Sequence, residues 1–170
     1  MKQLASSIQG TPVGPFTTIA GDGVVLASGW TGDINRLLRY VHPALRAEFA
    51  EQVRSYDDLG EISKAVVAFH DGDLTAPDRI PVRQHGSAFM TAAWQQLRTI
   101  PAGSTVSYRE YAALSGKPAA VRAAASSCAR NAAALFVPCH RVIRSDGSLG
   151  GFGYGLPIKD WLLHHESPST

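Results

Sequence analysis

The chain has 170 residues, of which 45% are hydrophobic and 18% are charged. This composition is typical of one or two compact domains with a real hydrophobic core. The formal net charge of +2 is unevenly distributed, because residues 1–84 carry 8 basic and 10 acidic side chains, whereas residues 85–170 carry 8 basic and 4 acidic ones. A basic second half suits a polyanionic partner, although an ordinary solvated surface would explain the same excess.

The sequence also excludes membrane and disulfide-rich classes. No apolar run approaches the ~18 residues of a membrane span, and the first seven residues lack the apolar segment of a signal peptide. The two cysteines, Cys128 and Cys139, are too few for a disulfide framework or a cysteine-rich zinc site. We therefore expect a cytoplasmic protein with reduced thiols.

The first half of the chain predicts a small mixed domain. Residues 15–20 and 24–30 are rich in Phe, Thr and Val and flank Gly21-Asp22-Gly23, which predicts a β-hairpin. The spacing of apolar residues predicts three helices, at residues 34–40, 45–53 and 62–69. Residues 75–82 are interrupted by proline and charge and predict a connector or an edge strand. A domain boundary is expected near Gln84.

The second half predicts a mostly helical domain. Ser87 is a candidate N-cap for a helix whose apolar residues recur every three or four positions up to Ile100. Residues 107–114 and 119–130 predict two short helices joined by a tight glycine-containing turn, which is typical of a helix-turn-helix. The remaining expected elements are a turn between two short strands at residues 144–148, a glycine-rich loop at 150–155 and a terminal helix at 158–166.

The helix predicted at residues 119–130 has two different faces. One face is apolar and should contact the core: Val121, Ala124, Ala125 and Cys128. We interpret Cys128 as a packing residue. The opposite face carries Arg122, Ser126 and Ala129. Such small side chains can approach a nucleic acid groove closely, and Arg122 could then fill the space of a displaced base. A solvated arginine on an alanine-rich surface helix is the alternative.

A possible nucleophile lies at Pro138-Cys139-His140. The thiolate is the reactive form of cysteine, so we expect partners that lower the pKa of Cys139. His140 could remove the thiol proton through a bridging water, because adjacent residues of a strand point to opposite faces. Glu166 could hold the other imidazole nitrogen and fix the tautomer. An inert cysteine beside an unrelated histidine is the alternative.

Taken together, these residues resemble the methylated-DNA–protein-cysteine methyltransferases, also called O6-alkylguanine-DNA alkyltransferases. The resemblance runs from Phe89 to Glu166. It rests on matching spacings of Ser107-Tyr108, Ser115-Gly116, Pro118, Arg122, Asn131, Pro138-Cys139-His140-Arg141-Val142-Ile143, Gly147 and Lys159 to Glu166. Residues 11–15, Thr-Pro-Val-Gly-Pro, also resemble the opening strand of the family's N-terminal domain, whereas residues 30–85 match only loosely.

The resemblance implies an α/β (α+β) fold in two domains. Residues 1–84 would form a small β-sheet and helix domain of ribonuclease H-like type, and residues 85–170 a winged helix-turn-helix domain that binds DNA and accepts the alkyl group. The implied activity is repair by direct reversal, in which the alkyl group of O6-alkylguanine, or of O4-methylthymine, is transferred irreversibly to Cys139. A single turnover after nucleotide flipping is implied, with no cofactor and no metal. The implied partner is double-stranded DNA, bound through the minor groove by a monomer.

The resemblance also implies a role for each matching residue. Cys139 would accept the alkyl group, His140 would remove its proton through water, and Glu166 would orient His140. Asn131 would brace the turn at Cys139, and Tyr108 would assist flipping at the phosphate and donate to the guanine ring nitrogen. The DNA-binding set would be Tyr108, Ala119, Arg122, Ser126 and Ala129. The substrate pocket would comprise the main-chain carbonyls of Cys139 and Val142 and the loop residues Phe152, Gly153, Tyr154 and Gly155.

The chain departs from the family pattern in the loop. Many relatives have Tyr-Ser-Gly-Gly or Tyr-Arg-Trp-Gly at positions 152–155, where this chain has Phe-Gly-Tyr-Gly. Hydroxyls are therefore absent at positions 152 and 153, and recognition of the guanine O6 is expected to rest on backbone N–H groups. Two other functions remain open. One is an alkyltransferase-like protein that binds the lesion without transfer, although such proteins replace the cysteine by tryptophan. The other is a thiol hydrolase with a Cys-His-Glu site.

Overall fold

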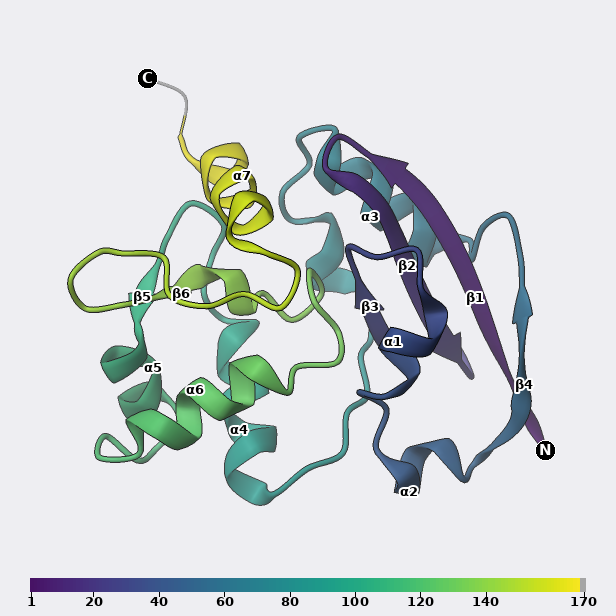
Figure 1. Cartoon of the computed structure of the whole chain (residues 1–170), viewed down its shortest axis with the longest axis horizontal. Helices are drawn as coiled ribbons and strands as arrows, with labels where there is room; N and C mark the ends of the chain where they lie inside the picture. The colour runs from purple at the N-terminus through teal and green to yellow at the C-terminus, as the bar shows by residue number, and fades with distance from the viewer. Residues whose placement is uncertain (169–170) are drawn as a thin grey trace. The chain divides into compact units, whose positions relative to one another are not determined.

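The computed structural model describes residues 1–168 and shows the expected mixed α/β protein (Figure 1). The chain forms two compact units. The first contains Met1–His85 and, in addition, Ala132–Phe136, whereas the second contains the other described residues. The expected domains, 1–84 and 85–170, are contiguous, whereas the structure places Ala132–Phe136 in the first unit. The sequence of a short apolar run does not show which element it will contact.

The first unit is built around a four-stranded sheet in the order β3-β2-β1-β4. Its strands are β1 (Lys2–Thr11), β2 (Gly14–Gly21), β3 (Val24–Gly29) and β4 (Phe49–Ser55). The first three strands are antiparallel neighbours, and β4 runs parallel to β1. The predicted hairpin is confirmed at β2 and β3. Asp22 and Gly23 have φ values of 56° and 79°, and two positive φ values in succession suit a tight hairpin turn.

Two strand assignments, those of β1 and β4, differ from the sequence-based expectation. The sequence of β1 is mostly polar and does not predict a strand, yet β1 pairs with a neighbour on each side. The helix predicted at residues 45–53 is wrong, because α2 (Pro43–Arg46) is a single turn and Phe49 begins β4. Residues 11–15 contain the end of β1, a turn at Pro12 and Val13, and the start of β2 at Gly14. For β1 and β4 strand pairing decides the conformation, and these two parallel neighbours are distant in sequence.

The helices of the first unit mostly follow the prediction. α1 (Ile34–Leu38) and α3 (Glu61–His70) confirm the helices expected at residues 34–40 and 62–69, and α3 packs against β1. α1 begins at Asp33, whose side chain accepts the N–H of Asn35 at 3.0 Å. The expected connector contains a 3-10 turn, η1 (Ala76–Arg79), and the chain beyond it pairs with β3 through a Val25–Val82 bridge.

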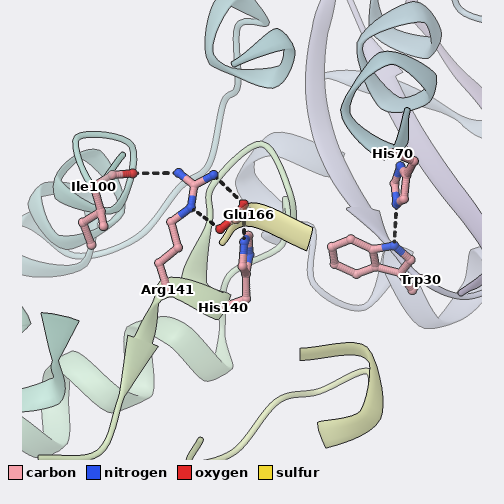
Figure 2. Close-up of polar contacts among 6 residues, drawn as sticks. All are labelled: Trp30, His70, Ile100, His140, Arg141 and Glu166. Atoms are coloured by element: carbon pink, nitrogen blue, oxygen red, sulfur yellow. Dashed lines mark hydrogen bonds and ion pairs between the residues drawn. The ribbon is translucent and has the colours of Figure 1, made fainter. Parts of the chain in front are cut away.

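An aromatic cluster fills the core of the first unit. The Phe16 ring centroid lies 5.0 Å from that of Trp30 and 6.4 Å from that of Phe136. The Trp30 indole donates to Nε2 of His70 at 3.2 Å (Figure 2). Nδ1 of His70 lies 2.8 Å from the carbonyl oxygen of Val66. This network assigns the hydrogen of a neutral His70 to Nδ1. The polar pair is thus accommodated in an apolar core without an unpaired donor.

The returning segment Ala132–Phe136 contacts the outer edge of β3. The backbone N–H of Ser28 donates to the carbonyl of Ala132 at 2.8 Å, and the Ser28 hydroxyl donates to the carbonyl of Ala134 at 2.8 Å. Covering the edge of a sheet in this way satisfies backbone groups that would otherwise be exposed. The short apolar run before the Pro-Cys-His motif is therefore explained by edge pairing as well as by burial.

The second unit is mostly helical, as predicted. Its elements are α4 (Ala88–Leu97), β5 (Val106–Ser107), α5 (Tyr108–Leu114), α6 (Val121–Ala129), the 3-10 turn η2 (Cys139–Arg141), β6 (Val142–Ile143) and α7 (Leu156–Glu166). The Ser87 hydroxyl caps α4 by accepting the N–H of Met90, and Ser107 and Glu110 form a reciprocal capping box at the start of α5. Within residues 1–168, no helix combines the length and apolar character needed to cross a membrane.

The turn predicted at residues 144–148 is present, but its flanking strands are not the predicted pair. Arg144 N–H donates to the carbonyl of Ser148 at 2.9 Å, and Gly147 N–H donates to the carbonyl of Arg144 at 3.0 Å. Among the described residues only β6 adjoins this turn, and β6 pairs in parallel with β5. The prediction of two short strands on either side of this turn is therefore wrong. β6 instead pairs with β5, which precedes α5 in the chain.

Candidate active site

The Pro-Cys-His segment leaves the extended conformation at the cysteine. Cys139, His140 and Arg141 form the 3-10 turn η2, which follows Pro138 and runs directly into β6. In a strand the side chains of Cys139 and His140 would point to opposite faces, and this turn removes that constraint. Cys139 is partly exposed, whereas His140 is 1% exposed and Arg141 is 3% exposed. The turn therefore presents the thiol while it holds the two basic side chains inside the unit.

The structure brings His140 and Glu166 together although they are 26 residues apart in the chain. Nε2 of His140 lies 2.9 Å from Oε2 of Glu166, which is the last residue of α7 and is also buried (Figure 2). A carboxylate only accepts, so this contact assigns the imidazole hydrogen to Nε2 and leaves the lone pair on Nδ1. Nδ1 is buried and has no hydrogen-bond partner among residues 1–168. The available basic atom of the site is therefore Nδ1.

Arg141 is a component that the sequence analysis did not assign. Its Nε and Nη2 donate to the two carboxylate oxygens of Glu166 at 3.0 and 2.7 Å, and its Nη1 donates to the carbonyl of Ile100 at 2.7 Å (Figure 2). This bidentate pair gives the buried carboxylate a compensating charge. Arg141 belongs to the quoted Pro-Cys-His-Arg motif, but only the folded chain shows that its target is Glu166.

The buried network sets the protonation of both partners. Burial raises the pKa of Glu166, but hydrogen bonds from His140 and Arg141 outweigh burial and hold this pKa at about 2. Burial lowers the pKa of His140, and the Glu166 carboxylate offsets that change only in part. The resting site therefore contains an ionised glutamate and a neutral imidazole, which is the form that can accept a proton.

The partners of Cys139 lower the pKa of its thiol, as the sequence predicts, but burial outweighs them and the net change is upward. Burial raises the pKa of the thiol, and the Asn131 side chain and the positive charge of Lys159 offset burial only in part. His140 supplies no positive charge, because it is neutral. The sulfur is therefore a protonated thiol at rest, and its proton has to leave when the thiol reacts rather than beforehand.

Asn131 lies next to the segment that carries the thiol. It directly follows α6 and the C-cap residue, and its side-chain amide donates to the carbonyl of Val137 at 2.8 Å. It also makes a hydrogen bond that favours the anionic form of Cys139. The Asn131 side chain can therefore restrain the segment between the end of α6 and Cys139. This position suits the expected role of bracing the turn at Cys139.

Lys159 is a second component that the sequence analysis did not assign. It is fully buried on α7, and its ammonium donates to the carbonyls of Val142, Leu149 and Gly151 at 2.8, 2.5 and 3.3 Å. It therefore ties β6 to the glycine-rich loop. The signal was present in the sequence, because Lys159 and Glu166 share the buried face of α7 with Leu162, where a charged residue is unusual.

Tyr108 is half-buried at the start of α5 and packs against the backbone of the loop. Gly150 has φ of 73°, and a Cβ placed there would lie 3.0 Å from the Tyr108 hydroxyl oxygen. Only glycine therefore allows this approach. Desolvation raises the pKa of Tyr108 to about 12, so its hydroxyl is a neutral donor at physiological pH.

The predicted DNA-binding residues on α6, and Ala119 just before it, are exposed. Ala119, Arg122, Ser126 and Ala129 are all exposed. The buried side of α6 differs slightly from the predicted stripe, because it is centred on Ala124 and Ser127. Ser127 is accommodated since its hydroxyl lies 2.7 Å from the Tyr111 hydroxyl and donates to the carbonyl of Ala124. Cys128 is a half-buried free thiol with a raised pKa, caused by burial, as suits a packing residue.

The expected pocket residues differ in their exposure to solvent. Val142 is fully buried in β6, where its carbonyl accepts from Lys159. In the loop, the rings of Phe152 and Tyr154 meet edge to face at 5.7 Å between centroids, and both are partly exposed. Gly153 lies between them and is exposed, and Gly155 precedes α7. The loop thus presents two aromatic rings, and among positions 152–155 its one side-chain hydroxyl is that of Tyr154.

Comparisons with known proteins agree with this arrangement. Residues 88–168 match the family model described as 6-O-methylguanine DNA methyltransferase, DNA binding domain. The chain is 50% identical over 91 residues to the bifunctional transcriptional activator and DNA repair enzyme Ada of Escherichia coli (strain K12), a match that covers 54% of this chain and only 26% of that protein. The crystal structure of OGT from Mycobacterium tuberculosis in complex with DNA matches with a TM-score of 0.78 and 30% identity, over 97% of this chain and 96% of that one.

A further relative extends the likeness along the first unit as well. The methylated-DNA–protein-cysteine methyltransferase of Shigella flexneri is 33% identical over 157 residues. That match covers 92% of this chain and 91% of the relative, so it includes both the sheet and the thiol site. Because identity at this level runs along nearly the whole of both chains, this chain belongs to the methylated-DNA–protein-cysteine methyltransferase family.

Proposed function

We propose that this DNA repair methyltransferase acts on O6-alkylguanine in duplex DNA and transfers the alkyl group irreversibly to its own Cys139. The observation that carries the proposal is the state of His140. Its Nε2 is fixed by Glu166, and its buried Nδ1 has an unused lone pair one residue from a partly exposed thiol. A neutral, oriented base beside a protonated thiol suits a reaction that starts only when an alkyl donor arrives.

The proposed reaction is a direct displacement at the alkyl carbon. The Cys139 thiol proton passes through a bridging water to Nδ1 of His140, a C–S bond forms and the C–O6 bond breaks. The electron pair of that bond stays on guanine, whose ring nitrogen takes the hydroxyl proton of Tyr108. The proton on His140 then returns through solvent to Tyr108. The products are S-alkylcysteine and unmodified guanine, so atoms and charges balance without a cofactor.

This chemistry makes the protein a single-use acceptor. The product is a thioether, whose cleavage would require a thiolate to leave from a saturated carbon. His140 and Glu166 can accept and orient a proton, but proton transfer alone does not break a C–S bond. We therefore propose one alkyl group per protein molecule.

We further propose that the protein acts as a monomer through the minor groove and flips the damaged nucleotide. The O6 edge of a paired guanine faces the major groove, so a thiol that approaches from the minor groove can reach the alkyl carbon only after the nucleotide leaves the stack. The exposed surface of α6 carries small side chains and one arginine, Arg122, which would occupy the vacated space. O4-methylthymine is proposed as a second substrate, because it presents an alkyl group on an equivalent exocyclic oxygen.

Intact-protein and peptide mass spectrometry test the proposal. The protein is incubated with a duplex that contains one O6-methylguanine, and Cys139→Ala serves as the control. We expect one added CH2 unit on Cys139, restored guanine in the DNA and a one-to-one limit. Tight binding to the lesion without modification would instead support the alkyltransferase-like function, and repair of several lesions per protein molecule would contradict the single-use acceptor.

A further inference from the structure

Arg144 stands beside Tyr108 at the end of the short parallel sheet of the second unit. In that sheet Val106 pairs with Val142 and Ser107 pairs with Ile143. The next positions in this register are Tyr108 and Arg144. Neighbouring strands of a sheet lie about 4.8 Å apart, so these two residues directly follow the C-terminal ends of the two paired strands and lie close together in the backbone. Tyr108 and Arg144 therefore lie at the same end of this short sheet.

The position of the Tyr108 hydroxyl is restrained from the loop side. Its oxygen packs against Gly150, where a Cβ would lie only 3.0 Å away. The carbonyls on either side of Gly150, those of Leu149 and Gly151, both accept from the buried ammonium of Lys159. The Tyr108 hydroxyl therefore packs against a backbone segment that Lys159 fixes by hydrogen bonds. Because its pKa is raised to about 12, the hydroxyl stays protonated and can donate.

Arg144 combines a fixed backbone with an exposed charge that makes no ion pair among the described residues. Its N–H and carbonyl close the turn at residues 144–148, and its side chain is exposed. Within residues 1–168 no carboxylate oxygen lies within 4.0 Å of its guanidinium. The nearest acid in sequence, Asp146, instead accepts the backbone N–H and the hydroxyl of Ser148 at 2.9 and 2.7 Å. The cation is therefore available to an external anion.

We propose that Arg144 binds a backbone phosphate of duplex DNA beside the flipped nucleotide, in one subsite with Tyr108. This inference rests on the proposed function, since it places the phosphate next to the base that reaches Cys139. A phosphodiester has two non-bridging oxygens and one negative charge. The Arg144 guanidinium can donate to both oxygens and leave no excess charge, while the hydroxyl of the neighbouring Tyr108 remains available to the guanine ring nitrogen. Such a contact fixes the position of the DNA but reads no sequence.

Rates of transfer from two substrates test this role. Arg144→Gln removes the charge of an exposed side chain, and Lys64→Gln makes the same charge change on an exposed lysine of the first unit. For Arg144→Gln we expect the rate constant with an O6-methylguanine duplex to fall roughly tenfold or more and the salt-dependence slope of duplex binding to fall by about 0.9. Reaction with free O6-benzylguanine base should be unchanged, because a free base has no phosphate. Lys64→Gln should match the wild type with both substrates.

Neutral methylphosphonates in the DNA locate the phosphate. In the wild type, replacing one phosphate beside the lesion should slow transfer about as much as Arg144→Gln does, and in Arg144→Gln the same replacement should cost little more. Arg144→Lys should recover part of the rate, since a lysine is also a phosphate ligand. Equal slowing with duplex and free base, an unchanged duplex rate, or methylphosphonate effects that simply add to that of the variant would each overturn the assignment. If wild-type protein transferred no alkyl group from the duplex, the proposed function itself would fail, which is a distinguishable result.

Discussion

Replacing Arg141 by methionine isolates the contribution of the buried ion pair. The substitution keeps much of the apolar stem but removes the two hydrogen bonds to Glu166, at 3.0 and 2.7 Å, and the one to the Ile100 carbonyl. Glu166 is then a buried carboxylate without its compensating charge. Removing one partner of a buried, hydrogen-bonded pair typically costs about 3–5 kcal/mol of stability.

The chain contains a matched control for this prediction. Arg83 and Glu48 form an equally well-aligned bidentate pair, at 2.9 and 2.8 Å, but both side chains are exposed to solvent. Arg83→Met should therefore change stability little, since exposed pairs are screened by water and salt. Urea denaturation of the wild type and both variants, followed by circular dichroism, measures the two effects. Equal losses in the two variants, or no loss in Arg141→Met, would refute the reasoning that burial decides the importance of the pair.

Three further predictions concern the same unit. Glu166→Gln should slow alkyl transfer by about two to four orders of magnitude, because an amide N–H that faces the imidazole favours the tautomer with hydrogen on Nδ1. Single-turnover kinetics measure this, and a rate close to wild type would show that the Nδ1 lone pair of His140 is not the base. Because folding lowers the pKa of Glu166 from 4.5 to about 2, the stability from this carboxylate is present above pH 4.5 and is lost as the pH falls toward 2. Acid titration of unfolding should show this loss in the wild type and a weaker one in Glu166→Gln. Gly150→Ala should slow transfer, since its Cβ would contact Tyr108, whereas Gly151→Ala, which has open space, should not; similar rates for both alanine variants would rule out this packing argument.

Much of the second unit follows from local sequence. The capping residues Ser87 and Ser107 and the three-to-four-residue apolar spacing predicted α4 and α5 within a few residues, because caps and periodicity act within one or two turns of the chain. The family could also be recognised, since its chemistry requires a particular residue at particular offsets around Cys139. The comparisons confirm that assignment.

The first unit was less predictable for a related reason. β1 and β4 depend on each other as parallel neighbours although about 50 residues separate them, as in the pairing of Leu4 with Val53. The spacing of apolar residues at 45–53 suits a helix as well as it suits a turn followed by a strand. Only the presence of a paired neighbour decides between them, and a local pattern does not contain that information.

By itself, the sequence determined which groups can react: a thiol, an imidazole and a carboxylate, at spacings that a known family shares. The tertiary structure alone decided their state. It places the Arg141 guanidinium in a hydrogen-bonded ion pair with Glu166 and leaves the imidazole lone pair on Nδ1 of His140. It also raises the pKa of Cys139, whereas a lowered pKa was expected from the sequence. The physical reason is that protonation depends on burial and on charges brought close by folding, and both are properties of the packed chain rather than of its order.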